Sequence, residues 1–274
     1  MPPGPQPRTL RERAAAAERR GEHERDMDSR KVTRQQLLTV LQELGRAPGE
    51  WVSVYLRPES VQARPAGLVL KSRVDPRLLE IASLIEDETL QRELARFGTG
   101  LSLFHGGATI AVAPPFPVEQ DEVVIGRPHI GPLLKQAERP RRTVLVLATW
   151  GAYVVALFDG EELVRYKKGT GHIHPPHKKG GSSQARFARR TENQRADFLR
   201  RVGGHIDEEL GTERVEHIFF GGNRLILRPL TGESRFLRDH ATAISPRTLL
   251  VKRATLDTMT GALADAYSAM LLRA

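Results

Sequence analysis

Three apolar segments in a row, separated by two short turns, constrain the fold of this chain more than any other feature. Residues 143–149 and 152–158 are almost continuously apolar, and residues 163–168 follow as a third segment. Glycine-containing breaks at Trp150-Gly151 and at residues 159–161 separate them. Segments of this length with glycine turns between them are typical of consecutive antiparallel strands. The pattern therefore predicts a three-stranded meander.

A loop and a long amphipathic helix follow the meander, the helix running from about residue 183 to residue 210. At 100° per residue, one broad face of this helix is apolar. That face carries Phe187, Ala188, Phe198, Leu199, Val202, Ile206 and Leu210. The opposite face carries Arg186, Arg189, Arg190, Arg200 and Arg201. We expect the first face to pack on a core and the second to present guanidinium groups, whose planar fork suits phosphates.

The remaining C-terminal elements predict how the meander becomes a larger sheet. Residues 217–220 are typical of a short buried strand, and Asn223, after two glycines, can cap a helix. A final strand is expected at residues 248–253 and a final helix at residues 256–272. Hairpin strands followed by strands that alternate with helices indicate a mixed sheet flanked by helices, an α/β (α+β) fold.

The first half of the chain predicts a smaller, separate α/β unit. Its expected elements are a helix behind Thr33, strands at residues 51–56 and 67–71, a helix from Asp75 to Leu94, a hairpin of residues 101–104 and 108–112, and a proline-rich linker or edge at residues 114–132. Trp51 and Trp150 are expected in cores. Residues 1–30 mix seven arginines with six acidic residues and indicate a disordered charged arm. We therefore divide the chain into an arm (1–30), an N-terminal domain (31–138) and a C-terminal domain (139–274).

Positive charge is concentrated in one window. The chain carries a formal net charge of +9. Residues 165–201 hold eleven lysines and arginines against Glu192 and Asp197, so this window alone has the same net charge as the whole chain. Such a concentration indicates a surface that binds phosphate polymers such as RNA, although a solvated helix face would give the same composition.

Other compositional features narrow the possible chemistry and location. Cysteine is absent, which excludes disulfides, thiolate metal sites and a cysteine nucleophile. No stretch approaches the roughly 20 apolar residues that span a bilayer, and the N-terminus lacks a secretory signal. We expect a cytoplasmic protein with no membrane partner.

The loop that precedes the basic helix has a specific sequence. It holds Gly180-Gly181 followed by Ser182, with Lys178 and Lys179 before the glycines and Gln184 after them. The helix then continues through Arg186, Phe187, Ala188, Arg189, Glu192, Arg195, Phe198, Arg200, Arg201 and Val202. This stretch resembles the catalytic domain of the eukaryotic and archaeal class-one peptide-chain release factors, in which a basic loop, Gly-Gly-Gln and a helix beginning near Arg-Phe-Ala-Arg occur in the same register.

The position of the glutamine differs from that in the classical release factors and indicates a particular branch of the family. Without gaps, the family's glutamine falls on Ser182, and Gln184 lies two residues further on. A Gly-Gly-Ser segment with a displaced glutamine is similar to the VLRF family, the Vms-like release factors of ribosome quality control, over about residues 141–274. We expect a bacterial, codon-independent relative with an RNase H-like catalytic domain, because no stop-codon-reading domain is recognisable.

The resemblance implies hydrolysis of the ester between a nascent peptide and its tRNA on stalled large ribosomal subunits. It implies catalytic roles for Gly180, Gly181, Ser182 and Gln184 in the loop 169–184. A glutamine amide both donates and accepts hydrogen bonds, so it can hold a water molecule at the ester. Contacts to ribosomal RNA and to the tRNA acceptor end are expected from Lys167, Lys168, Lys178, Lys179, Arg186, Arg189, Arg190, Arg200 and Arg201. No cofactor is expected.

Several alternatives accompany this interpretation. His172, His174 and His177 could chelate a metal, but two prolines stiffen the segment and it holds no carboxylate, so we expect no metal. Ser182 or Ser183 could act as a nucleophile with one of these histidines, although the loop offers no orienting acid. The protein could also be a non-catalytic ribosome- or tRNA-binding factor, or a nuclease that trims the tRNA acceptor end.

Overall fold

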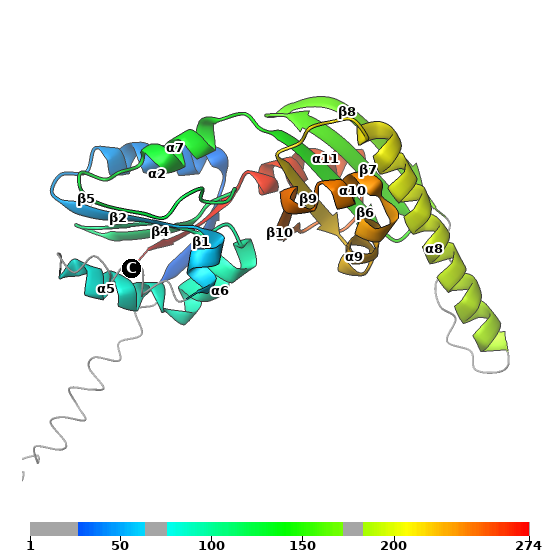
Figure 1. The fold of residues 1–274 in the computed structure, drawn as a ribbon, viewed down its shortest axis with the longest axis horizontal. Helices are drawn as coiled ribbons and strands as arrows, with labels where there is room; N and C mark the ends of the chain where they lie inside the picture. The colour runs from blue at the N-terminus through cyan, green and yellow to red at the C-terminus, as the bar shows by residue number, and fades with distance from the viewer. Residues whose placement is uncertain (1–26, 64–75, 172–182, 274) are drawn as a thin grey trace, which may run out of the picture.

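Two β-sheets with helices packed on them make up the fold of this protein, for which we used a computed structural model (Figure 1). The structure describes residues 27–63, 76–171 and 183–273. The elements of the first half are β1 (Asp28–Val32), α2 (Arg34–Gly45), β2 (Trp51–Leu56), α3 (Pro58–Gln62), α5 (Arg77–Ile85), α6 (Glu88–Phe97), β3 (Leu101–His105), β4 (Thr109–Ala113), β5 (Glu122–Gly126) and α7 (Gly131–Glu138).

The second half contributes β6 (Arg142–Thr149), β7 (Ala152–Asp159), β8 (Glu162–Thr170), α8 (Ser183–Leu210), β9 (His217–Gly222), α9 (Arg224–Glu233), α10 (Arg235–Asp239), the 3₁₀ turn η1 (Ala241–Ala243), β10 (Ile244–Leu249), α11 (Leu256–Ala266) and β11 (Ala269–Arg273). None of the helices in the described ranges is long and apolar enough to cross a membrane.

The first sheet is antiparallel, with the strand order β1-β11-β4-β3-β2-β5. Helices α2 and α7 cover one face, and α5 and α6 cover the other (Figure 1). All six residues of β2 are buried, because alternate side chains enter two different cores. The predicted hairpin is confirmed as β3 and β4, and the proline-rich segment contains the edge strand β5. The predicted strand at residues 67–71 lies outside the described residues.

The second sheet is mixed, with the strand order β10-β9-β6-β7-β8. The predicted meander is confirmed, since β6 pairs with β7 and β7 with β8, both antiparallel. Strands β9 and β10 add parallel neighbours on the other side of β6. Helices α8, α9 and α10 pack on one face and α11 on the other. The predicted fold class, a mixed sheet flanked by helices within an α/β chain, is confirmed.

The last strand of the chain corrects two sequence predictions. The final helix was expected to reach residue 272, but α11 ends at Ala266 and β11 follows. This strand inserts between β1 and β4 of the first sheet, where Leu271 and Leu272 are fully buried. Pairing with two neighbours decides in favour of a strand, because a short apolar run suits a helix and a buried strand equally well. Residues 28–30, expected in the arm, begin β1 and pair with β11.

Two further element predictions were wrong in their bounds. A single helix was expected to continue to Leu94, but α5 ends at Ile85 and α6 starts at Glu88. Asp87 starts the second helix, because its carboxylate accepts a hydrogen bond from the Leu90 amide at 3.0 Å. The strand expected at residues 248–253 is β10, which begins earlier and ends at Leu249.

Each sheet has its own pair of buried cores, and the second half of the chain returns one strand to the first sheet. We propose that the N-terminal domain comprises the first sheet with β11 and its helices, and that the C-terminal domain comprises the second sheet with α8 to α11. Strand β11 then ties the end of the C-terminal domain to the N-terminal domain.

Candidate functional site

The loop predicted to act in catalysis connects the edge strand β8 to helix α8. Strand β8 ends at Thr170, two residues beyond its predicted end, and α8 begins at Ser183, as predicted. Gly180, Gly181 and Ser182 lie outside the described residues, as do Lys178, Lys179 and the three loop histidines. Gln184 is the second residue of α8.

The beginning of this loop lies close under α8, and two glycines make the close approach possible. A Cβ on Gly169 would lie 2.3 Å from the Tyr153 hydroxyl, and one on Gly171 would lie 2.7 Å from the Phe198 ring. Arg201 of α8 donates a hydrogen bond to the Thr170 carbonyl at 3.2 Å. Glycine is therefore required at both positions, and the first stem of the loop is attached to the helix.

Helix α8 has the two-faced character that its sequence predicts. Its 28 residues make it roughly 42 Å long at 1.5 Å per residue. Phe198, Val202, Ile206 and Leu210 are buried against the sheet. Arg186, Arg189, Arg190, Arg200 and Arg201 are exposed. Figure 1 shows that the C-terminal half of α8 covers the sheet, whereas its N-terminal half projects beyond it.

The cations predicted to bind RNA differ in how far carboxylates of this chain neutralise them. Lys167 Nζ lies 3.3 Å from Glu209 Oε1 and 4.0 Å from Glu208 Oε2, and these glutamates raise the pKa of Lys167. Arg200 forms an ion pair with Asp197 on the same helix. Both cations are therefore partly compensated.

Other predicted cations keep their charge uncompensated. Arg186, Arg189 and Arg190 form no ion pair with any residue that the structure describes. Lys168 is exposed and pairs in register with Val154, whereas Lys167 pairs with Val155, which belongs to the core under α8. Lys168 therefore faces away from α8. The strongest free positive charge among the described residues is the projecting half of α8.

One arginine of the basic window has a role that charge counting missed. Arg195 falls on the apolar face of α8, and its guanidinium carbon lies 4.8 Å from the centre of the Trp150 ring. The Trp150 ring is in turn 6.1 Å from that of Phe198. The helical position of Arg195, among apolar residues, is the signal that could have separated it from the arginines predicted to contact RNA. Trp150 is half-buried at the β6–β7 turn, and Trp51 is buried, as predicted.

A partly buried polar pair supports the same part of the helix. The hydroxyl of Tyr153 on β7 and Nδ1 of His205 on α8 form a hydrogen bond. Burial raises the pKa of Tyr153, while Lys167 and Arg201 act in the opposite direction. Tyr153 also contacts Phe198 edge to face, with ring centroids 6.1 Å apart. These contacts fix α8 above the stem of the loop at Gly169.

The residues of the two alternative sites, a metal site and a serine nucleophile, lie outside the part of the chain that the structure describes. His172, His174 and His177 lie there, and so do the side chains of Ser182 and Ser183. Within the described ranges, no group of three or more histidine, aspartate or glutamate side chains could hold a metal ion.

Comparison with known families identifies the second half of the chain. Residues 141–271, which include the meander, α8 and the strands after it, match a family of release factors. The family is that of the VLRF1 release factor of Actinobacteria and Chloroflexi. The resemblance to the VLRF release factors that was predicted from the sequence is therefore confirmed over this part of the chain.

Solved structures show more distant likenesses. An archaeal translation termination factor, aRF1, is 14% identical with a TM-score of 0.34, over 86% of this chain and 73% of that one. Pelota from Archaeoglobus fulgidus is 8% identical with a TM-score of 0.26, over 88% of this chain and 63% of that one. Dom34 from S. cerevisiae is 9% identical with a TM-score of 0.29, over 88% and 67%. No curated protein sequence matches the chain.

Proposed function

We propose that this protein is a cytoplasmic peptidyl-tRNA hydrolase that releases nascent chains from stalled large ribosomal subunits without reading a codon. The observation that carries this proposal is the match of residues 141–271 to the VLRF1 release-factor family. Its partners would be the ribosomal RNA of the large subunit and the acceptor end of the peptidyl-tRNA.

The geometry of α8 supports this proposal in two ways. First, the helix projects from the sheet, with Gln184 in its first turn, so the segment that carries Gly180 and Gly181 precedes the projecting end. Second, the exposed Arg186, Arg189 and Arg190 line this projecting half. A narrow element with free guanidinium groups suits insertion into a cavity walled by RNA phosphates.

The proposed chemistry is addition of water to an ester carbonyl. A water molecule attacks the carbonyl carbon, the bond to the ribose oxygen breaks, and the products are a peptide carboxylate and a tRNA with a free terminal hydroxyl. The amide of Gln184 would orient the water, and hydrogen-bond donors near Gly181 would stabilise the oxyanion. The ribosome would contribute much of the positioning of the substrate.

A second candidate function is a ribosome- or tRNA-binding factor without catalysis. The observation that favours it is Ser182, which occupies the position of the glutamine in the classical factors. In that case the arginines of α8 would bind RNA, but no group would orient a water molecule.

Incubation with stalled large subunits that carry labelled peptidyl-tRNA tests these functions together. A gel of the products distinguishes them: hydrolysis gives free peptide and intact tRNA, a non-catalytic factor leaves peptidyl-tRNA unchanged, and a nuclease gives a peptide that still bears nucleotides. Our proposal requires the first result. Either of the other two would contradict it.

A further inference from the structure

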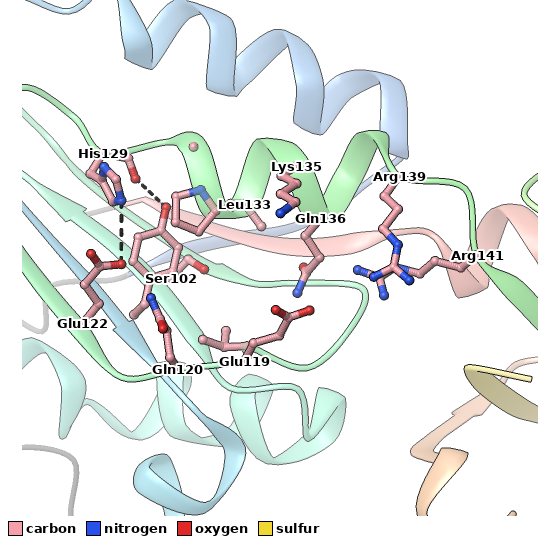
Figure 2. A pocket seen from close by; sticks show the side chains of 14 residues that line it. Ser102, Glu119, Gln120, Glu122, His129, Leu133, Lys135, Gln136, Arg139 and Arg141 are labelled. Carbon is pink, nitrogen blue, oxygen red and sulfur yellow. Dashed lines mark hydrogen bonds and ion pairs between the residues drawn. The ribbon is translucent and has the colours of Figure 1, made fainter.

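A cleft of about 430 Å³ opens on the first sheet, between α7 and the segment that leads into β5 (Figure 2). The residues that line it come from β2, β3, the segment 118–122 and the region from His129 to Arg141. The cleft is thus separate from helix α8 and from the residues proposed for peptide release. Its volume lies in the range of about 300–1,000 Å³ typical of small-molecule sites.

Three buried polar atoms in the lining lack a hydrogen-bond partner within the described part of the chain. They are Ser102 Oγ, Gln136 Oε1 and Arg141 Nε, on residues that are 0%, 9% and 5% exposed. The Gln136 amide nitrogen donates to the Phe116 and Pro117 carbonyls at 3.0 and 2.9 Å, so its oxygen is held as an acceptor. Because buried unpaired polar groups are costly, a bound ligand that pairs with them would be stabilised.

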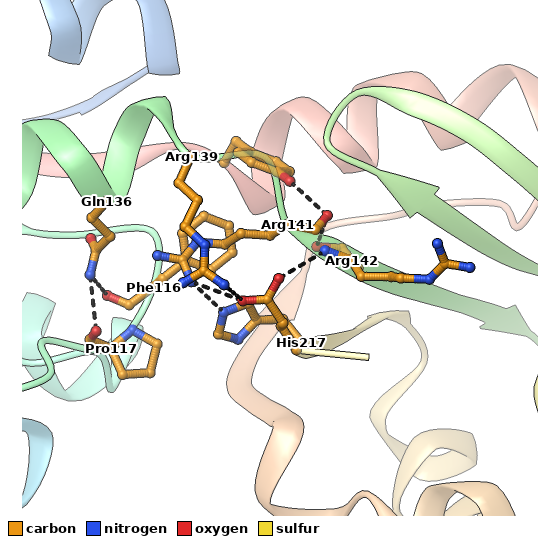
Figure 3. A network of polar contacts seen from close by, with 10 residues as sticks. Phe116, Pro117, Gln136, Arg139, Arg141, Arg142 and His217 are labelled. Carbon is orange, nitrogen blue, oxygen red and sulfur yellow. Dashed lines mark hydrogen bonds and ion pairs between the residues drawn. The ribbon is translucent and has the colours of Figure 1, made fainter. Parts of the chain in front are cut away.

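One end of the cleft is positively charged. Arg139 and Arg141 share a single carboxylate, that of Glu216, at 2.5 and 3.6 Å (Figure 3). Burial lowers the pKa of the adjacent His217 to about 4, and the positive charges of Arg141 and Arg139 act in the same direction. The His217 ring is therefore neutral at pH 7. Lys135 is exposed and forms no ion pair with the described residues. Glu119, which also lines the cleft, acts on the pKa of Arg141 together with Glu216, so among the described residues of the lining Lys135 is the cation that remains to bind an anion such as a phosphate.

The middle of the cleft provides acceptors and apolar walls. Figure 2 shows the side chains of Glu119 and Gln136 directed into the same space, and Val118 and Leu133 also line it. A ligand seated there needs a donor group for the two acceptors and a flat or apolar body for the walls. A nucleobase with an exocyclic amino group has both properties, and it carries its phosphate on the same molecule.

We propose that this cleft binds one nucleotide unit, either a free ribonucleotide or one nucleotide of an RNA strand. Its phosphate lies at Lys135, and the amino group of its base donates to Gln136 Oε1. Ser102 contributes a further hydrogen bond to the ligand. This site lies on the N-terminal domain and does not depend on peptide release.

Calorimetric titration of the full chain with AMP, CMP, UMP and inorganic phosphate tests this proposal. AMP and CMP should bind about fivefold more tightly than UMP, because uracil lacks the amino donor. Lys135→Ala should weaken AMP binding about tenfold, whereas the charge-matched control Lys252→Ala, at an exposed position, should leave it unchanged. Unchanged binding by the Lys135 variant, both of AMP and of a short adenylate oligonucleotide, would overturn the proposal.

A second titration identifies the source of the nucleotide. A short single-stranded adenylate oligonucleotide is compared with AMP on the wild type, Lys135→Ala and Lys252→Ala. If Lys135→Ala weakens both ligands, a free nucleotide is sufficient. If it weakens only the oligonucleotide, the ligand is an RNA strand. If it weakens neither while Lys252→Ala behaves as wild type, the cleft binds no nucleotide.

Discussion

The guanidinium carbon of Arg195 lies 4.8 Å from the centre of the Trp150 ring, one turn before Phe198, which is buried against the second sheet. Trp150 belongs to the turn between β6 and β7, so this contact joins the middle of the helix to the meander. Phe198 and Tyr153 continue the contact towards the core. The arginines of the projecting half are thereby presented on a helix that is held from one side.

Arg195 and Arg189 should therefore act differently although both belong to the basic window. We expect Arg195→Gln to lower the free energy of unfolding by about 1 kcal/mol, the typical size of a cation–π contact, and to leave ribosome affinity almost unchanged. Arg189→Gln should weaken ribosome binding and leave the free energy of unfolding almost unchanged. Urea unfolding and ribosome co-sedimentation of the two variants provide the test. Equal loss of ribosome affinity in both, without loss of stability in Arg195→Gln, would contradict our account of this contact.

The projecting arginines should dominate the salt dependence of ribosome binding. Replacement of Arg186, Arg189 and Arg190 by alanine should weaken binding and flatten the fall in affinity with added salt, because fewer counterions are released. The double variant of Lys167 and Arg200 should have a smaller effect, since both are paired with carboxylates of this chain. Co-sedimentation across a salt series measures both, and an unchanged salt slope in the triple variant would exclude the projecting half as the RNA-binding surface.

Two adjacent glycines in α8 provide a matched test of its packing. A Cβ on Gly203 would lie 2.4 Å from the Glu233 carbonyl oxygen at the end of α9, whereas one on Gly204 would have no neighbour within 4 Å. Gly203→Ala should destabilise the protein by about 1–3 kcal/mol through overpacking. Gly204→Ala should stabilise it by about 0.5–1 kcal/mol, since alanine favours a helix. Thermal unfolding of both variants measures these effects. Destabilisation by Gly204→Ala would contradict the prediction, because it would mean that Gly204 packs against another part of the protein.

His217 should make the free energy of unfolding depend on pH below about pH 6.5. Its folded-state pKa is lowered from 6.5 to about 4, so the unfolded chain binds a proton more readily in this interval. The stabilising contribution is fully present above pH 6.5 and is lost as the pH falls towards 4, at up to roughly 1 kcal/mol per pH unit. His217→Gln should flatten this part of the profile. Parallel urea unfolding of the two proteins from pH 7 to pH 4.5 measures it, and identical slopes would contradict the assignment.

Local patterns in the sequence predicted the elements whose signals lie within a few neighbouring residues. The meander and α8 follow from apolar runs, glycine turns and helical periodicity. Asn223 caps α9 as expected, because a cap depends only on the adjacent backbone, and Thr33 caps α2 in the same way. Strand β11 could not be predicted in this way, since its pairing with β1 and β4 involves residues more than 150 positions away.

In the candidate site, too, features that depend on one element alone could be predicted, and contacts between elements could not. The exposed arginine face of α8 could be predicted, since it depends on the period of the helix alone. The contact of Arg195 with Trp150 and the ion pairs of Lys167 with Glu208 and Glu209 could not, because each needs the position of a second element. The cleft beside α7 was not predicted either, because its lining comes from segments that are far apart in the sequence, from Tyr55 to Arg141.

The central proposal is that Gln184 orients the water that hydrolyses peptidyl-tRNA. The most direct measurement is the rate of peptide release from stalled large subunits by the wild type and by Gln184→Ala, with Ser182→Ala as the control and ribosome binding measured in parallel. We predict that Gln184→Ala lowers the rate on the order of 10²–10³-fold, as loss of one transition-state hydrogen bond does, while binding is retained and Ser182→Ala has a mild effect. If Ser182→Ala abolishes release and Gln184→Ala does not, the assignment to Gln184 is contradicted.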